Sequence, residues 1–212
     1  MKISEELRLS QSLKDFYKKL EGHEVTVGEF IDSLGEKGFG ILFLIFALPS
    51  MLPIASAGIA TPLGLVIAFL GLQMIIGRTI PWLPKRARAI KMKAEFAKKM
   101  IEWMLKFSSK MERFIRPRMD FMTHRMGERM MGFLICVIAL IMALPFPLTN
   151  TAPAIVIFLI GVGLAESDGL MCLIGTVLAV ATIIAYGYAF FLFLFYGKAA
   201  FIGLLHWVKN LF

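Results

Sequence analysis

Three long stretches of the chain carry no charged side chain: residues 38–77, 130–165 and 169–197. About 20 apolar residues are enough for one helix to cross the hydrocarbon core of a bilayer. The first two stretches are long enough for more than one crossing, so the pattern predicts four to six crossings in all. The fold class that follows is an all-α integral membrane protein.

The first two stretches share an order of landmarks, which predicts an internal repeat. Each begins after Gly-Glu and a basic residue, passes through Gly-Phe and Ala-Leu-Pro, and then contains further prolines and a glycine. Duplicated apolar segments interrupted by proline are typical of transport folds whose broken helices form a site inside the bilayer. The paired landmarks lie 90 to 96 positions apart: Glu36 with Glu128, Pro49 with Pro145, Pro62 with Pro153, and Gly71 with Gly161.

Closely spaced prolines predict that the first helix of each repeat is broken. Proline has no backbone N–H and disfavours a helical conformation of the residue before it. Pro53 follows Pro49 by four residues, and Pro147 follows Pro145 by two. The helix that breaks at Pro49 and turns near Pro53 within the bilayer would be re-entrant.

A second arrangement of the first repeat stays open. Its two helices would then cross completely, over about 38–57 and 60–77. Whether the two repeats are parallel or inverted also stays open.

Small polar residues cluster at both predicted breaks. They can cap the backbone groups that a break leaves unpaired, or they can bind a sugar, a phosphate or an ion. The two uses do not exclude each other. The candidate binding residues are Pro49, Ser50, Pro53, Ser56 and Thr61 in the first repeat and Pro145, Pro147, Thr149, Asn150 and Thr151 in the second.

Charged residues that flank the apolar stretches form a second candidate set. A charge near a bilayer is costly, so each needs a partner or a function. Packing of the two repeats would bring Arg78 to Glu166 or Asp168 and join the repeats. The alternatives are solvated positions at the headgroup level and a path for substrate or protons. The full set is Glu36, Arg78, Glu128, Arg129, Glu166 and Asp168.

A basic connector separates the repeats. Residues 78–129 carry 15 of the 23 Lys and Arg, and apolar residues recur there from Met92 to Ile115 at helical spacing. A basic amphipathic helix between spanning segments is typical of an interfacial element on the cytoplasmic side, where it contacts anionic lipid headgroups. This context argues against nucleic acid as the partner. The predicted segments are an N-terminal arm (1–37), repeat one (38–77), the connector (78–129), repeat two (130–168), and a C-terminal helix with an interfacial tail (169–212).

The N-terminal arm and the C-terminal run contain further local signals. Apolar residues at helical spacing predict an amphipathic helix over about 7–20. Thr26 and Glu29 have the spacing of a capping box, which predicts a second helix that places Phe30, Ile31 and Leu34 on one face. The C-terminal run over 169–197 suits one tilted span. Two shorter spans over 170–208 are the alternative, for which Gly187 and Gly197 are candidate hinges. Glycines that suit close helix packing, within one chain or between two, are Gly58, Gly64, Gly71, Gly161 and Gly163.

The sequence contains no catalytic motif and no metal-ligand spacing. His23, His124 and His206 lie in separate segments, and Cys136 and Cys172 lie in apolar runs. A cysteine in such a run is most often a small buried hydrophobic residue. No catalytic residue, metal site or cofactor is therefore predicted, and an enzyme is disfavoured.

Five short motifs occur in a fixed order: Gly-Glu-Lys-Gly-Phe-Gly at 35–40, Phe-Ala-Leu-Pro-Ser at 46–50 with Leu-Pro at 52–53, Gly-Arg-x-x-Pro-Trp-Leu-Pro at 77–84, Arg-Pro-Arg at 116–118, and Glu-Ser-Asp-Gly at 166–169. Together they resemble the ExoD family of bacterial exopolysaccharide-synthesis proteins, from about residue 12 to residue 196. One departure is Pro147-Leu148-Thr149-Asn150, where the family pattern has a glycine before the asparagine. The resemblance implies a multi-pass protein of the bacterial inner (cytoplasmic) membrane and a role in producing extracellular polysaccharide. It implies no catalytic residues.

Two functions stay open. One is a small transporter or flippase-like carrier with a site at the two broken repeats, and its small size predicts a homodimer. The other is a non-catalytic membrane subunit or regulator that docks polysaccharide-synthesis proteins through the connector and the N-terminal arm. A membrane-embedded transferase or hydrolase is disfavoured by the missing acid and base residues.

Overall fold

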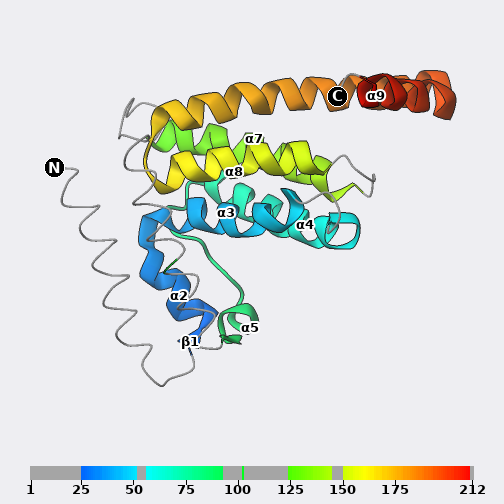
Figure 1. Cartoon of the computed structure of the whole chain (residues 1–212). Helices are drawn as coiled ribbons and strands as arrows, with labels where there is room; N and C mark the ends of the chain where they lie inside the picture. Colours follow the sequence, from blue (N-terminus) through cyan, green and yellow to red (C-terminus); the bar gives the residue numbers. More distant parts are fainter. Residues whose placement is uncertain (1–24, 52–55, 93–101, 103–123, 145–149, 211–212) are drawn as a thin grey trace.

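The computed structural model describes residues 25–51, 56–92, 102, 124–144 and 150–210. Within these ranges the fold is helical apart from one pair of two-residue strands, which confirms the predicted helical class (Figure 1). In chain order the elements are β1 (Val25–Thr26), α2 (Val27–Leu34), the 3₁₀ turn η1 (Gly35–Lys37), α3 (Gly38–Met51), α4 (Ser56–Ile75), α5 (Lys85–Arg88), β2 (Lys91–Met92), α7 (Arg125–Ala143), α8 (Thr151–Ala165) and α9 (Gly169–Lys209).

Two of these helices are long and apolar enough to cross a membrane, by length and composition among the described residues: Arg125–Ala143 and Gly169–Leu192. Three more are apolar but shorter: Gly38–Met51, Ala60–Ile75 and Thr151–Ala165. The predicted apolar stretches are thus mostly helical where the structure describes them.

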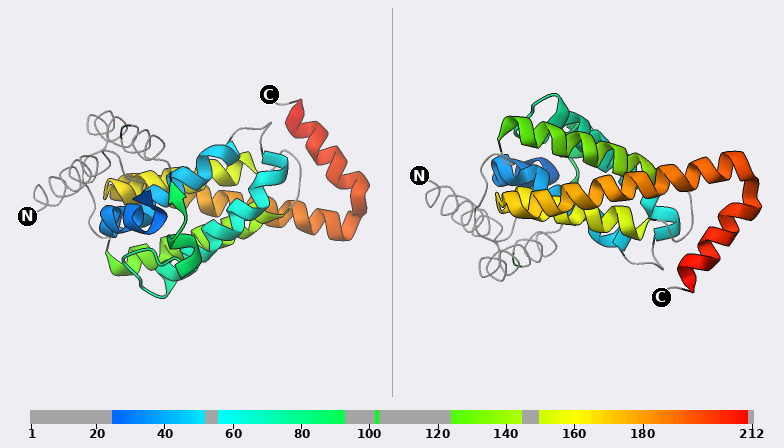
Figure 2. Two further views of the ribbon diagram at one scale, coloured as in Figure 1. Left: turned by 90° about the horizontal axis from the view of Figure 1, so that it is seen from below. Right: turned by 90° about the horizontal axis from the view of Figure 1, so that it is seen from above.

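Helices α3, α4, α7 and α8 form a bundle in which α3 packs on α8 and α4 packs on α7 (Figures 1 and 2). Each pairing joins a helix of the first predicted repeat to a helix of the second. Gly40, near the start of α3, lies against Gly161 near the end of α8. Gly71, near the end of α4, lies against Gly132 near the start of α7. Both helix pairs are therefore antiparallel.

Four of the five predicted packing glycines act within one chain, and the surroundings of Gly58 lie outside the described part of the structure. Besides Gly71 and Gly161, Gly64 lies against the backbone of Ala139, and Gly163 against Cys172. The close approach of backbones that glycine permits is thus used between helices of the same molecule.

The N-terminal arm and the start of the connector meet at one end of the bundle. Val25 pairs with Met92 in the antiparallel strand pair β1–β2, and the ring of Pro81, after α4, lies against Gly38 at the start of α3. Helices α3 and α4 therefore form a hairpin whose two outer ends meet. We call this the polar end, where α3, α7 and α9 begin and α4 and α8 end. At the opposite, proline end, α3 and α7 end and α4 and α8 begin.

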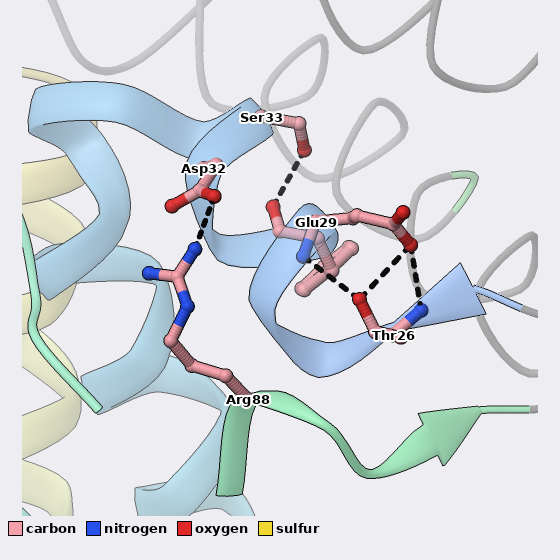
Figure 3. Close-up of polar contacts among 6 residues, drawn as sticks. Thr26, Glu29, Asp32, Ser33 and Arg88 are labelled. Atoms are coloured by element: carbon pink, nitrogen blue, oxygen red, sulfur yellow. Dashed lines mark hydrogen bonds and ion pairs between the residues drawn. The ribbon is translucent and has the colours of Figure 1, made fainter. Parts of the chain in front are cut away.

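The predicted capping box of the arm is confirmed (Figure 3). The Glu29 N–H donates to the Thr26 hydroxyl at 3.3 Å, and the Thr26 N–H donates to the Glu29 carboxylate at 2.9 Å. Arg88 of α5 pairs with Asp32 of α2 at 2.5 Å, so the connector holds the arm in place. The buried face of α2 consists of Gly28, Phe30, Ile31 and Leu34.

Helix α2 is expected to loosen at acid pH through Glu29. The hydrogen bonds that its carboxylate accepts from the Thr26 backbone and hydroxyl lower the pKa of Glu29 below its ordinary value of 4.5. A lowered folded-state pKa gives stabilisation that is present above the unfolded-state pKa and is lost as the pH falls through the folded-state pKa. The measurement is amide hydrogen exchange of α2 against pH, corrected for the intrinsic exchange rate.

Two variants separate the charge of Glu29 from the cap itself. Glu29→Gln keeps the capping geometry but cannot titrate, so its protection should not depend on pH. Thr26→Ala should lower protection at every pH, by about 1 kcal/mol. A wild-type pH slope in Glu29→Gln would contradict this assignment.

The first break lies later than predicted. Helix α3 (Gly38–Met51) contains Pro49, so the helix does not break at that residue. The described part of α3 reaches Met51 and α4 begins at Ser56. Whether the two helices of the first repeat cross completely stays a prediction. In the second repeat, α7 ends at Ala143 and Leu144 is extended, as expected for a residue that precedes proline.

Helix α9 continues through Gly187 and turns at Gly197 (Figure 2). Of the two candidate hinges, Gly197 is therefore a hinge and Gly187 is not. The φ of Gly197 is 72°, in the left-handed region that glycine adopts without strain. Cys172 and Ala179 are buried against the bundle, whereas no neighbouring atom lies within 4 Å of a Cβ built on Gly187. The first half of α9 packs on the bundle, and its second half extends past the proline end (Figure 1).

Several predicted features lie outside the described residues. They are the amphipathic helix of the arm over 7–20, most of the connector helix (93–101 and 103–123), and the break residues Pro53, Pro145, Pro147 and Thr149.

Candidate functional site

Two buried polar atoms have no hydrogen-bond partner among the described residues: Ser50 Oγ and Asn150 Oδ1. The two residues are 1% and 4% exposed. Leaving a buried donor or acceptor unpaired costs about 1–3 kcal/mol, and native proteins contain few such atoms. Both residues belong to the candidate set predicted from the sequence, one in each repeat.

Ser50 and Asn150 lie at the same end of one helix pair. Ser50 is in the last turn of α3, and Asn150 directly precedes α8. Because α3 and α8 are antiparallel neighbours, the end of the first and the start of the second both lie at the proline end. The fold thus gathers polar groups from the two predicted breaks.

The local backbone explains why Asn150 is not used as a cap. Asparagine is a favoured N-cap when its backbone is extended, but Asn150 is helical (φ −81°, ψ −22°) and makes no side-chain cap bond. Its backbone carbonyl accepts from the Ala154 N–H at 3.0 Å. The side-chain oxygen remains as an acceptor beside the positive end of the α8 dipole.

Ser50 is also unusual for a helical serine. Such hydroxyls commonly bond to a carbonyl one turn earlier in their own helix, but Ser50 Oγ has no described partner. A hydroxyl can both donate and accept, and the Asn150 oxygen accepts. Together these neutral groups suit a ligand that is rich in hydroxyls.

The other candidates at the proline end contribute less. Thr61 of α4 and Thr151 of α8 are half-buried, and Pro49 is exposed. Ser56 begins α4, but its side chain is outside the described part of the structure. The remaining candidates of the two breaks also lie outside it.

At the polar end, Arg78 and Asp168 have partners near them in the sequence. The Arg78 guanidinium lies 5.8 Å from the centre of the Trp82 ring. Asp168 is buried and accepts from the N–H groups of Leu170 and Met171 at 2.8 and 3.4 Å, which caps α9. The predicted contact of Arg78 with Glu166 or Asp168 stays a prediction.

Arg78 and Asp168 occupy equivalent positions at the ends of α4 and α8. Each donates its N–H to the carbonyl five residues earlier, as in a Schellman motif. The residues before them, Gly77 and Ser167, both have positive φ, of 90° and 53°. The bonds are Arg78 to Gln73 at 3.1 Å, Gly77 to Met74 at 2.9 Å, Asp168 to Gly163 at 2.8 Å and Ser167 to Leu164 at 3.4 Å.

The other charged candidates are spread over the polar end. Glu128, in the first turn of α7, and Glu166, at the end of α8, are half-buried. Arg129 is exposed and its guanidinium lies against Gly77. Glu36 belongs to η1, and its side chain is outside the described part.

Sequence reasoning missed one residue of the polar end, Gln73. It is 5% exposed, and its side-chain amide makes two hydrogen bonds with the backbone of Trp82. A lone glutamine in an apolar run was the available signal, because burial of such an amide requires partners.

Comparison with known proteins gives a family match over most of the chain. The family model described as "Exopolysaccharide synthesis, ExoD" matches residues 9–188. An uncharacterized protein of Synechocystis sp. is 36% identical over 175 residues, which are 82% of each chain. Protein ExoD of Rhizobium meliloti is 32% identical over 190 residues, which cover 86% of this chain and 79% of that protein. No solved structure matches.

Proposed function

Because the chain belongs to the ExoD family of exopolysaccharide-synthesis proteins, we propose that it is a small carrier in the bacterial cytoplasmic membrane, with a saccharide-binding site at the proline end. The observation that carries the proposal is the pair of buried, unpartnered atoms Ser50 Oγ and Asn150 Oδ1. Sugar hydroxyls are donors and acceptors that would satisfy both atoms. Since the two residues come from different predicted repeats, a bound sugar would bridge the repeats.

The outer surface of the bundle supports an embedded protein. Large apolar side chains face outward along α4, α7 and α9, where a monomer in water would rarely expose a continuous apolar patch of this kind. Examples that are at least 48% exposed are Leu65 and Leu72 on α4 and Ile76 directly after it, Met126, Met130 and Phe133 on α7, and Val177, Ile184, Tyr188, Leu194 and Phe195 on α9.

Charge supports a cytoplasmic polar end. Basic residues gather there, whereas the segments 52–55 and 144–150 at the proline end contain no charged residue. Cytoplasmic segments of membrane proteins carry the excess of Lys and Arg. The basic residues at or next to the polar end are Lys37, Arg78, Lys85, Arg86, Arg88, Lys91, Arg125 and Arg129.

Helix lengths support a site at membrane depth. At 1.5 Å per residue, α3 and α8 are about 21 and 22 Å long, shorter than the hydrocarbon core of about 30 Å. With the polar end at the cytoplasmic surface, the proline ends of α3 and α8 would lie inside the bilayer. Such a position is tolerated where the backbone is buried in protein or lines a wet cavity.

The alternative is a non-catalytic membrane subunit or regulator of the polysaccharide machinery. The tight backbone contacts at Gly40–Gly161 and Gly71–Gly132 favour it, because they suit a rigid bundle. In this case α2 and α5 would form a docking surface at the polar end. Substituting Lys85, Arg86 or Arg88 would then remove function, and Ser50 and Asn150 would be inaccessible.

If the chain is instead a carrier, its small size means that it is expected to act as a homodimer.

Cysteine labelling in native membranes tests the carrier proposal. In a Cys136→Ala/Cys172→Ala background, Ser50→Cys and Asn150→Cys should react with a small charged thiol reagent. The reagent should reach them because a carrier site must open to water. A saccharide substrate should slow both reactions.

Ala47→Cys and Ala154→Cys are matched controls. Both alanines are 0% exposed and lie about one turn from Ser50 and Asn150 in the same helices. They should not react. Four unreactive positions would overturn the carrier and leave the regulator, because the proline end would then be sealed.

A further inference from the structure

Two arginines, one beside each predicted repeat, are placed at the end of α4. Nη2 of Arg129 lies 2.6 Å from the place that a Cβ of Gly77 would take, so the missing side chain makes room for the guanidinium. Arg78 is the next residue, its guanidinium lies 5.8 Å from the centre of the Trp82 ring, and both arginines are exposed. The negative end of the α4 dipole offsets only part of the positive charge that the two side chains bring to this place. An anion bound by both would offset the rest.

The arginine pair lies where the apolar surface stops. The outward face of α4 carries a stripe of large apolar side chains that ends at Ile76, directly before Gly77. Met126 and Met130, 69% and 58% exposed on the neighbouring α7, continue that surface. The members of the α4 stripe are Leu65, Phe69, Leu72 and Ile76.

Trp82 also lies beside the apolar stripe of α4. Its side chain is 46% exposed, and its ring lies 6.2 Å from that of Phe69 on the α4 stripe. Tryptophan is enriched where the hydrocarbon core of a bilayer meets the headgroups. The arginines therefore stand at headgroup depth, with the apolar stripe leading to them.

The loop that holds these groups is fixed by Gln73. Its Nε2 donates to the Trp82 carbonyl at 3.0 Å, and its Oε1 accepts from the Trp82 N–H at 2.7 Å. The two bonds tie Trp82 to the last turn of α4, close to Arg78. A site held in place before binding loses less conformational entropy when the ligand arrives.

We propose that Arg78 and Arg129 bind the phosphate of one anionic lipid headgroup from the cytoplasmic leaflet, with Trp82 beside it. The guanidinium fork matches phosphate oxygens and can donate two bonds at once. The acyl chains lie along the exposed stripe of α4 and beside Met126 and Met130, which is why a lipid fits this place better than a soluble anion. This site is at the end opposite to Ser50 and Asn150 and does not depend on the carrier proposal.

Native mass spectrometry of the full chain in detergent tests the site. Phosphatidylglycerol and phosphatidylcholine with the same acyl chains are titrated in parallel. One phosphatidylglycerol should bind more tightly than any phosphatidylcholine. Arg78→Gln/Arg129→Gln should weaken that binding by about tenfold or more, since each removes a charge-assisted hydrogen bond.

Lys85→Gln/Arg86→Gln is the matched control. It removes the same charge from two exposed residues of α5 at the same end, and it should change binding less than threefold. An equal loss in both double variants would overturn the site, because the cations would then act only as a diffuse field. Equal binding of the two lipids by the wild-type chain would overturn it as well.

Two further variants keep the test independent of folding. Arg78→Lys/Arg129→Lys keeps the charge but loses the fork, and it should bind phosphatidylglycerol several-fold more weakly than wild type. Gln73→Leu changes no charge and should reduce the preference for phosphatidylglycerol by releasing the loop. Unchanged binding in both variants would overturn the proposed geometry.

Discussion

Gly40→Ala is expected to prevent stable assembly of the bundle. A Cβ on Gly40 would overlap the backbone N of Ala165 and lie 2.7 Å from the carbonyl oxygen of Gly161. Neither atom is the far end of a flexible side chain, so α3 and α8 would have to move apart along their whole contact. Overpacking alone costs about 1–3 kcal/mol, and separation of the helices adds lost contacts. Against a total stability of about 5–15 kcal/mol, the expected loss is about 3 kcal/mol or more.

The measurement is the yield of monodisperse protein and its thermal unfolding midpoint in detergent. Gly187→Ala is the matched control, because no neighbouring atom lies within 4 Å of a Cβ built there. Alanine is the better helix former by about 1 kcal/mol, so this variant should unfold at the wild-type temperature or slightly above it. A Gly40→Ala protein with an unchanged midpoint would show that α3 and α8 do not pack as closely as the structure has them.

Gly132 tests the second helix pair in the same way. A Cβ there would lie 2.6 Å from Cβ of Met74 and 2.9 Å from the carbonyl oxygen of Gly71. A Cβ is fixed to its backbone, so Gly132→Ala should also force its two helices apart. Its closest contacts are longer than those at Gly40, where the nearest atoms belong to the backbone of α8, so it should destabilise less than Gly40→Ala. The order of the three glycine variants is thus set by what each new methyl group meets.

The positions of the elements could be predicted because their signals are local. The capping box needs only Thr26 and Glu29 at the right spacing, and uncharged runs identify the helices by length. The break expected at Pro49 was wrong, since Pro49 lies inside α3, so a proline alone does not fix where a helix stops.

Helix pairing could not be predicted, because α3 and α8 are apolar on every side and so mark no contact face. Gly40 and Gly132 entered only as landmarks of the repeat. Their partners are Gly161 and Gly71. The internal duplication itself stays a prediction.

The sequence identified a set of candidate site residues by their type, and the structure singles out two residues of that set. Ser50 and Asn150 stand out only because burial leaves them without partners, and burial depends on the register of α3 against α8. The sequence suggested that Asp168 pairs with Arg78 or lies on a path for substrate or protons, whereas in the structure its carboxylate caps α9. The sequence could not distinguish these roles, because a capping carboxylate and a functional one are the same residue type.

The two ends of the chain are expected on opposite sides of the membrane. The arm contacts α5 at the polar end, and α3, α4, α7 and α8 would each cross or enter the bilayer between the polar end and the proline end. Helix α9 then starts at the polar end and runs past the proline end (Figure 1). From Gly169 to the turn at Gly197 it is about 42 Å long, enough for one tilted crossing.

Reporter fusions measure this arrangement. Alkaline phosphatase, active only outside the cytoplasm, should be active when fused after Asn210 and inactive when fused after Asp168. A fluorescent protein that folds only in the cytoplasm should give the opposite pattern at the same two positions, and should fluoresce at the N-terminus. The two fusion points differ only by α9, so the change of side is assigned to that helix. Cytoplasmic fluorescence after Asn210 would mean that the chain returns through the membrane after Gly197, which would give an even number of crossings and contradict the proposed topology.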